Sequence, residues 1–414
     1  MNRLKHISIH IFSFIFLKIF TLKLIKIKFS LSLFFLLSLS QNILSQSDSL
    51  SIENKKVEEN VGRFRYIDLK GHTGLHKYSG ESLENLLGLG YGSFDVKFGW
   101  KPSIPEHWSN NYGYASYGIG YYIGFIGNPN VLGTPNAIFG FVNFPVSHPS
   151  KRNVFQISPA FGFVFNLKPY DEISNPLNDS FGSKYAFYSN INIGAAYFVS
   201  QNMDLLYGID LTHLSLGRVT TPNYGLNMVG INLGLRYYYN NDQRKLNKNS
   251  SNIQLQSRFS RYSGNTKTNL NESLINIYTA IGTVQNEEDK GTSNRYYTFS
   301  GVIDYQYKFN TMHAITTGID LFYDESLVLY YPDKKDRYLV GIHAGYDFMV
   351  YKFAFRFQGG AYIGDDKDKE PLYMRVAFQY EFTKWMYAQI GIKSKKGARA
   401  DWMEWGIGFK PFKW

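Results

Sequence analysis

Three residues in the stretch 204–239 combine side-chain types and a spacing that suit ester hydrolysis. His213 and Ser215 lie two positions apart, and Asn227 follows on the next alternating stretch. A serine hydroxyl becomes a nucleophile when a neighbouring base takes its proton, and that base needs a third polar group to fix its tautomer. His213 suits the base, Ser215 the nucleophile and Asn227 the orienting group. Such residues also occur in the polar headgroup band of membrane barrels, so the spacing alone leaves both interpretations open.

The elements that must position these residues are two β-strands. Residues 205–215 and 225–239 alternate apolar and polar side chains with the period of a strand. Because successive side chains point to opposite faces, His213 and Ser215 share one otherwise apolar face, which Asn227 joins if the strands pair. We therefore expect all three on an outer wall at the membrane boundary. The expected facing is lipid for Ile209, Leu211, Val229 and Ile231, and lumen for Asp210 and Arg236.

The same alternation recurs along most of the chain. It predicts eight strands within residues 61–240 and eight within 274–414, joined by a polar segment, 241–273, in which 253–259 could add a short strand. Long and short connections alternate, as in outer-membrane barrels with short periplasmic turns and longer external loops. Residues 102–111 are the exception, because they make a rather long inner turn. The predicted fold is an all-β, antiparallel transmembrane barrel of about 16 strands. One sixteen-stranded barrel is favoured over two tandem eight-stranded barrels, because the chain ends in a single aromatic-rich strand.

The composition agrees with a membrane barrel. Aromatic residues make up 17% of the chain, which has 37 Gly and a mean hydropathy of -0.27. A barrel meets lipid with one residue in two, so its mean hydropathy stays near that of soluble proteins. The formal charge is +11, but six basic residues and no acidic ones lie within residues 1–45, leaving +5 for the rest. No basic stripe suggests a nucleic-acid partner.

Other side chains that could do chemistry give weaker signals. The absence of cysteine excludes disulfides, thiol nucleophiles and a lipid-anchored N-terminal cysteine. The histidines show no metal-ligand spacing, and residues 365–368 resemble a solvated charge run more than a calcium site, so we expect neither metal nor cofactor. Five charged residues are expected to face inward, where they could line a pore or pair within a plugged lumen: Asp304, Lys308, Arg356, Arg375 and Glu381.

The N-terminus has the features of an export signal. A lysine-punctuated stretch precedes the apolar run 29–39, which is too short to span a membrane as a helix. We predict a signal peptide over residues 1–45, cleaved close to Ser45, and a short periplasmic segment over residues 46–60. N-terminal sequencing of the protein from outer-membrane fractions would test the cleavage, and an intact segment 29–45 would indicate an anchor.

The segment HLSLGRVTTPNYGLN, residues 213–227, resembles the active-site hairpin of the outer-membrane lipid A 3-O-deacylase family, also called acyloxyacyl hydrolase-like. The resemblance covers roughly residues 61–240, which look like the enlarged Bacteroidetes-type form. It implies that His213 is the base and Ser215 the nucleophile. It further implies that Pro222, Asn223 and Gly225 belong to the loop and that Asn227 stands at the position of the acid.

Two positions depart from the family pattern. Leu216 stands where the family has an asparagine that helps the oxyanion hole, and the loss of one such donor costs about 10²–10³ in rate. Asn227 replaces the carboxylate; its amide can accept the imidazole N–H but cannot stabilise the imidazolium with a charge.

The resemblance implies an outer-membrane esterase that hydrolyses an ester-linked acyl chain of the lipid A in lipopolysaccharide. Its partners would be lipopolysaccharide in the outer leaflet and the machinery that assembles outer-membrane barrels. The alternative is a non-catalytic barrel, either a pore or a structural protein with a decayed site. Leu216 and Asn227 favour decay, whereas His213 and Ser215 on a common face favour use.

Overall fold

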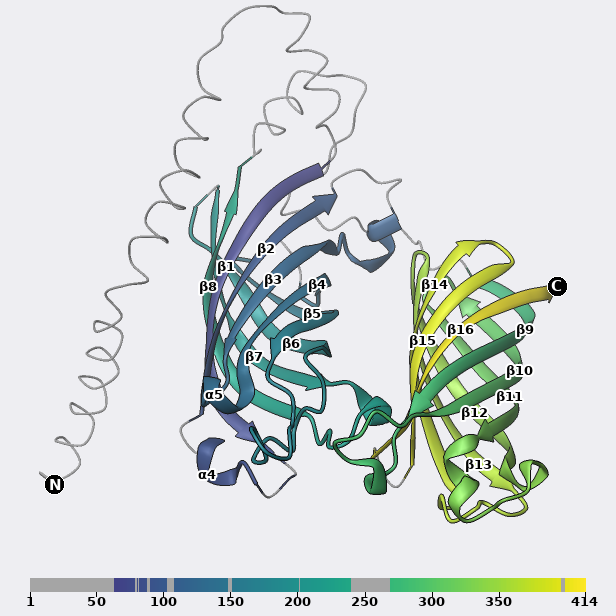
Figure 1. Ribbon diagram of the computed structural model, residues 1–414. Coiled ribbons are helices and arrows are strands. Elements are labelled where there is room, and N and C mark those ends of the chain that lie inside the picture. Colours follow the sequence, from purple (N-terminus) through teal and green to yellow (C-terminus); the bar gives the residue numbers. More distant parts are fainter. Residues whose placement is uncertain are drawn as a thin grey trace, which may run out of the picture. The chain divides into compact units, whose positions relative to one another are not determined.

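The computed structural model describes residues 63–239 and 269–414, apart from 79, 81, 88–89, 103–107, 148–150, 201 and 396–398. The expected signal peptide, the periplasmic segment 46–60 and the extra strand at 253–259 lie outside the described residues. Strands β1 to β8 close into one barrel, the N-terminal barrel, drawn from purple to teal in Figure 1. Strands β9 to β16 close into a second, the C-terminal barrel, drawn from green to yellow.

The strands of the N-terminal barrel are β1 (Arg63–Lys77), β2 (Tyr91–Pro102), β3 (Ser116–Phe125), β4 (Gly133–Pro145), β5 (Asn153–Leu167), β6 (Ala186–Phe198), β7 (Met203–Ser215) and β8 (Leu226–Tyr238). Those of the C-terminal barrel are β9 (Asn269–Val284), β10 (Tyr296–Asn310), β11 (His313–Asp324), β12 (Tyr338–Val350), β13 (Phe353–Ile363), β14 (Leu372–Thr383), β15 (Met386–Lys395) and β16 (Arg399–Lys413). The short helices are α4 (Glu84–Leu87), α5 (Pro129–Leu132), η1 (Trp108–Tyr112), η2 (Gly217–Val219), η3 (Glu287–Asp289), η4 (Glu325–Leu329) and η5 (Lys334–Arg337).

The preference for one sixteen-stranded barrel was wrong. β1 pairs with β8, with Leu69 opposite Leu235, and β16 pairs with β9, with Ile407 opposite Thr279. Each set of eight strands therefore satisfies its own edge hydrogen bonds, which lipid would leave unpaired. Alternation in a sequence shows which face a residue takes, but it does not show which strand the first one closes against.

The facing predicted for the site hairpin is confirmed. On β7 the side chain of Ile209 is 60% exposed and its neighbour Asp210 only 1%, and on β8 Ile231 is 64% exposed while Arg236 is buried. Leu211 and Val229 are exposed as well. The apolar residues thus form the outside of the barrel and the charged ones its interior.

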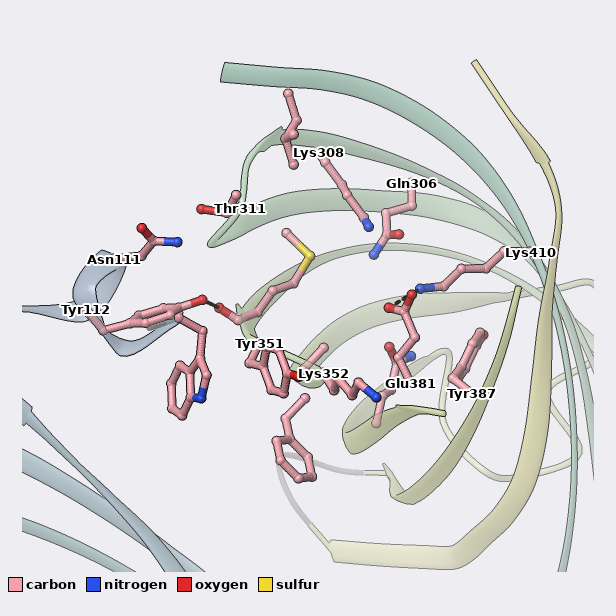
Figure 2. Close-up of a pocket in the computed structure, with 16 residues that line it drawn as sticks. Asn111, Tyr112, Gln306, Lys308, Thr311, Tyr351, Lys352, Glu381, Tyr387 and Lys410 are labelled. Carbon is pink, nitrogen blue, oxygen red and sulfur yellow. Dashed lines mark hydrogen bonds and ion pairs between the residues drawn. The ribbon is translucent and has the colours of Figure 1, made fainter. Parts of the chain in front are cut away.

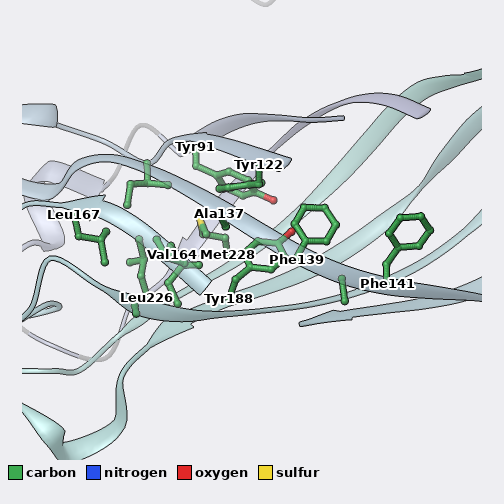
Figure 3. Close-up of a cluster of buried hydrophobic side chains, with 14 of the residues drawn as sticks. Tyr91, Tyr122, Ala137, Phe139, Phe141, Val164, Leu167, Tyr188, Leu226 and Met228 are labelled. Atoms are coloured by element: carbon green, nitrogen blue, oxygen red, sulfur yellow. The ribbon is translucent and has the colours of Figure 1, made fainter. Parts of the chain in front are cut away.

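The interior of the N-terminal barrel is filled largely by aromatic and aliphatic side chains, some of which Figure 3 shows. The ring of Tyr188 lies 5.0 Å from that of Phe139 and 5.2 Å from that of Tyr122, measured between centroids. Buried charged groups accompany them: Arg236 donates to both carboxylate oxygens of Asp68, at 2.7 and 2.8 Å, and Lys97 lies 3.4 Å from Asp95. Eight strands enclose an interior that side chains can fill, and here they do.

Charge pairs fill the C-terminal barrel instead. Arg356 binds Asp347 and Asp304, with N–O distances of 2.7–2.9 Å. Arg375 binds Glu404 and Asp320 at 2.7 and 2.9 Å. Two more of the inward-facing residues, Lys308 and Glu381, pair with Glu272 and Lys410 respectively. Each of the five inward-facing residues is therefore in an ion pair, but only Arg356 and Asp304 pair with each other.

Long connections lie at one end of each barrel, although residues 103–115 make an equally long connection at the opposite end of the N-terminal barrel. In the N-terminal barrel the first end carries residues 78–90, 126–132, 168–185 and 216–225, and in the C-terminal barrel residues 285–295, 325–337 and 364–371. The turns at the opposite end of the C-terminal barrel are as short as 311–312 and 351–352. The β15–β16 connection, expected to be long, spans only 396–398. No helix in the described part of the chain is both long and apolar enough to span a membrane.

Candidate active site on the outer wall of the N-terminal barrel

The β7–β8 pair brings His213 and Asn227 together. The two residues are direct partners in the register, and His213 Nδ1 lies 2.7 Å from Asn227 Oδ1. An amide oxygen only accepts, so Nδ1 carries the proton and donates it. Nε2 is then left with a free lone pair, which is the state that a general base requires. The side chain of His213 is exposed on the outer wall.

Ser215, the last residue of β7, is held by the loop that follows it. Its Oγ accepts from the backbone N–H of Gly217 at 3.1 Å and from Asn223 Nδ2 at 3.0 Å. Among the hydrogen bonds of the described residues, none joins Ser215 to His213. The donor role of Gly217 was missed in the sequence, because a backbone N–H leaves no signal there. Asn223 was assigned only to the loop, although it supplies a side-chain donor close to the position where Leu216 supplies none.

Gly225 keeps open a space that the base and the nucleophile share. A Cβ on this residue would lie 3.0 Å from Ser215 Cβ, 3.3 Å from His213 Cε1 and 2.8 Å from the carbonyl oxygen of Leu214. Its φ of 68° also lies in the left-handed region, which favours glycine. Glycine is therefore required here by both the space and the backbone. The side chains of His213 and Ser215 border the same small gap on the wall.

Apolar side chains surround this gap on neighbouring strands. Phe187 on β6 is the register partner of Ser215, but its ring is buried, 5.1 Å from that of Phe163 on β5 and 5.7 Å from that of Trp405 on β16. Leu211 and Val229, one step towards the middle of the wall, are exposed and opposite one another. A hydrocarbon chain can lie against such a wall while its polar end meets the three polar residues.

Other titratable clusters are less suited to chemistry. His72 lies between Asp210 and Asp95, at 2.5 and 3.0 Å, but all three side chains are enclosed within the N-terminal barrel. In the exposed loop 365–368, a side-chain and a backbone hydrogen bond from Lys367 lower the pKa of the Asp365 carboxyl, as expected of a solvated pair. No group of three metal-ligating side chains occurs among the described residues.

A cavity of about 320 Å³ at the short-turn end of the C-terminal barrel offers a second candidate (Figure 2). Lys308, Lys410 and Glu381 line it together with Gln306 and Tyr387, and Lys410 Nζ lies 2.9 Å from Glu381 Oε2. The cavity contains no histidine, and its carboxylate is already paired. It brings together no nucleophile and base, so it does not compete with the outer-wall site.

Two family models match the chain. The one described as lipid A 3-O-deacylase (PagL) covers residues 92–236, which include His213, Ser215 and Asn227. The other, described as the C-terminal domain of acyloxyacyl hydrolase, covers residues 273–414, the whole set of strands β10 to β16 and nearly all of β9. No curated protein matches the chain significantly.

Solved outer-membrane proteins are similar only in general terms. Pseudomonas aeruginosa OccK5 (OpdH) is 8% identical with a TM-score of 0.20, over 85% of this chain and 98% of that one. A mutant of the Rh. blastica porin is 11% identical with a TM-score of 0.18, over 83% of this chain and 99% of that one. At such TM-scores the likeness carries no argument.

The closed antiparallel barrels and the two family matches define a β-barrel protein of the bacterial outer membrane, of a class that acts on acyl esters. Within that class, the chain belongs to the lipid A 3-O-deacylase (PagL) family, and its second barrel corresponds to the C-terminal domain of the acyloxyacyl hydrolases.

Proposed function

We propose that the protein hydrolyses an ester-linked acyl chain of lipid A, with Ser215 as nucleophile, His213 as base and Asn227 as the orienting group. The observation that carries this proposal is the hydrogen bond of 2.7 Å between His213 Nδ1 and Asn227 Oδ1 on the outer wall. It frees Nε2 to act as a base beside a serine that borders the same gap.

The reaction follows from these groups. Ser215 rotates its hydroxyl towards His213, whose Nε2 takes the proton while Oγ attacks the acyl carbonyl carbon. The tetrahedral intermediate collapses with cleavage of the bond to the sugar oxygen, and His213 returns the proton to that oxygen. Water then attacks the acyl-serine, again through His213, which releases a fatty acid and restores the Ser215 hydroxyl. We assign the oxyanion donors to the Gly217 N–H and Asn223 Nδ2, which donate to Ser215 Oγ before the reaction and lie beside the carbon that Oγ attacks.

Lipopolysaccharide reaches the site from the side. An exposed His213 above an apolar wall that includes Leu211 and Val229 suits a substrate whose ester lies at the membrane boundary and whose chain runs into the bilayer. A water-soluble ester would gain nothing from that wall.

The alternative is a barrel whose site has decayed. Asn227 carries no charge to stabilise an imidazolium, and Leu216 contributes no side-chain donor. These two residues favour a slow or inactive enzyme. Asn223 and the Gly217 N–H argue against decay, because they place two donors on Ser215 without the help of residue 216.

Mass spectrometry of lipid A tests the proposal. Cells that produce the parent protein should contain lipid A that has lost one acyl chain, and cells that produce Ser215→Ala should not. Ser189→Ala is the matched control, since Ser189 on β6 is the register partner of His213. Intact lipid A with the parent protein would favour the non-catalytic barrel. Loss of activity in Ser189→Ala but not in Ser215→Ala would show that Ser215 is not the nucleophile.

A further inference from the structure

The active-site loop 216–225 is hydrogen-bonded to the β9–β10 connection of the C-terminal barrel. The backbone N–H of Gln285 donates to the carbonyl oxygen of Arg218 at 3.0 Å, and Arg218 Nε donates to the carbonyl oxygen of Gln285 at 3.1 Å. Arg218 Nη2 also donates to Asn286 Oδ1. Each segment thus donates a hydrogen bond to a carbonyl oxygen of the other.

Gln285 continues this contact with its side chain. Its Oε1 accepts from the backbone N–H of Thr221 at 2.7 Å and from Thr221 Oγ1 at 3.2 Å. Its Nε2 donates to the carbonyl oxygens of Asp289 at 2.7 Å and Thr292 at 3.0 Å. The side chain is 1% exposed, and both ends of the amide are occupied. The Gln285 amide is therefore fixed through Nε2 by the β9–β10 connection, and through Oε1 it holds the active-site loop.

Strand β16 supports the same loop where it donates to the nucleophile. Gly217 has a φ of 65°, and a Cβ on it would lie 3.2 Å from Met403 Cγ. Arg218 Nη1 lies 3.6 Å from Asp401 Oδ1, a carboxylate that Lys369 and Lys393 also bind. The N–H that binds Ser215 Oγ is therefore flanked by two residues of the C-terminal barrel.

We infer that the C-terminal barrel positions the active-site loop of the N-terminal barrel, with Gln285 as the principal positioning residue. Gln285 touches neither Ser215 nor His213. It acts through residues 218–221, which lie between the two donors, Gly217 and Asn223. A donor is effective only where its geometry is fixed before the oxyanion forms. This role gives the C-terminal barrel a part in the reaction, and it rests on the proposed esterase function.

The test replaces Gln285 with an apolar side chain of similar length. Gln285→Met removes both the acceptor for Thr221 and the two donors, and Gln389→Met is its matched control. Gln389 is equally buried in the same barrel and bonds to Gln379 within the lumen. Steady-state release of fatty acid from lipid A by the full-length protein should show kcat about 10–10²-fold lower for Gln285→Met, with KM little changed. Gln389→Met should keep the parent kcat.

A measurement that does not depend on activity completes the test. In hydrogen–deuterium exchange of the folded protein, residues 216–224 should exchange faster in Gln285→Met than in Gln389→Met. Equal kcat for the parent and Gln285→Met, or an equal loss in both Met variants, would overturn the inference. If the parent shows no activity, the proposed function fails, and the exchange of residues 216–224 alone decides the inference: unchanged exchange in Gln285→Met overturns it.

Discussion

The two barrels have the same number of strands and the same antiparallel closure, but their last hairpins differ. In the N-terminal barrel, β7 and β8 are joined by residues 216–225, and the loop places two donors on Ser215. In the C-terminal barrel, β15 and β16 are joined by residues 396–398 alone, and residues 386–413 contain no histidine. The closed barrel is common to both halves and does not distinguish them. The N-terminal barrel differs in its β7–β8 connection, which is long enough to place two hydrogen-bond donors on Ser215.

Their interiors differ as well. The N-terminal barrel contains the larger cluster of aromatic and aliphatic side chains, whereas in the C-terminal barrel arginine–carboxylate pairs lie beside smaller aromatic clusters. Buried charges need partners, because an isolated ion in a low-dielectric interior is costly. Both interiors serve to fill a closed barrel, so the difference concerns how each barrel is stabilised.

The largest expected effect comes from replacing one histidine in each barrel. His213→Ala should lower the release of fatty acid at least about 10³-fold, since loss of a triad base costs that much or more. His313→Ala is the control, because His313 is a half-buried histidine of the C-terminal barrel, beside Tyr346. It should keep the parent rate. The rates are measured by mass spectrometry of lipid A. Comparable losses in the two variants would contradict an active site on the outer wall of the N-terminal barrel.

The difference between the interiors predicts a difference in stability. Arg375→Met leaves two buried carboxylates, Asp320 and Glu404, without their arginine and should lower the free energy of unfolding by about 3–5 kcal/mol. Arg236→Met leaves only Asp68 and should cost less. Urea unfolding in detergent micelles measures both. Equal losses would show that the aromatic interior of the N-terminal barrel depends on its ion pair as strongly as the other barrel depends on its network.

The sequence predicted the wall of the site well, and the reason is local. Side chains alternate along a strand, so the facing of His213, Asn227 and Ile231 follows from their positions in the chain. The closure of the barrels depends on which distant strand pairs with β1, and alternation contains no information on that choice. The single-barrel preference failed for this reason.

The loop was predicted less well, because its conformation depends on residues far away in the sequence. Thr221 is held by Gln285, which lies 64 positions further along the chain. The donation from Gly217 to Ser215 is a property of the folded backbone. Motif residues such as Asn223 and Gly225 could be located from the sequence, but their contacts could not.

Gly225 offers a sharper comparison with a glycine of the C-terminal barrel. Gly225→Ala would place a Cβ 2.8 Å from the Leu214 carbonyl oxygen and 3.0 Å from Ser215 Cβ, at a φ of 68°. We expect the displaced nucleophile to lose about 10² in kcat. Gly364→Ala is the matched control, since Gly364 also has a positive φ, 86°, but open space around its missing Cβ. If both variants retain the parent kcat, the shared gap at Gly225 does not matter for catalysis.

The smallest expected change is a gain. Asn227→Asp keeps the size of the side chain and its 2.7 Å contact with His213 Nδ1, but adds the charge that Asn227 lacks. A hydrogen bond to a charged group is worth about 1 kcal/mol more than a neutral one, so kcat should rise about fivefold as the imidazolium forms. Asn223→Asp is the opposite case, because it turns a donor to Ser215 into an acceptor and should lower kcat. Both rates come from the same fatty-acid release assay. A fall in kcat for Asn227→Asp would mean that catalysis requires a neutral amide at position 227, and that Asn227 is not a weakened substitute for a carboxylate.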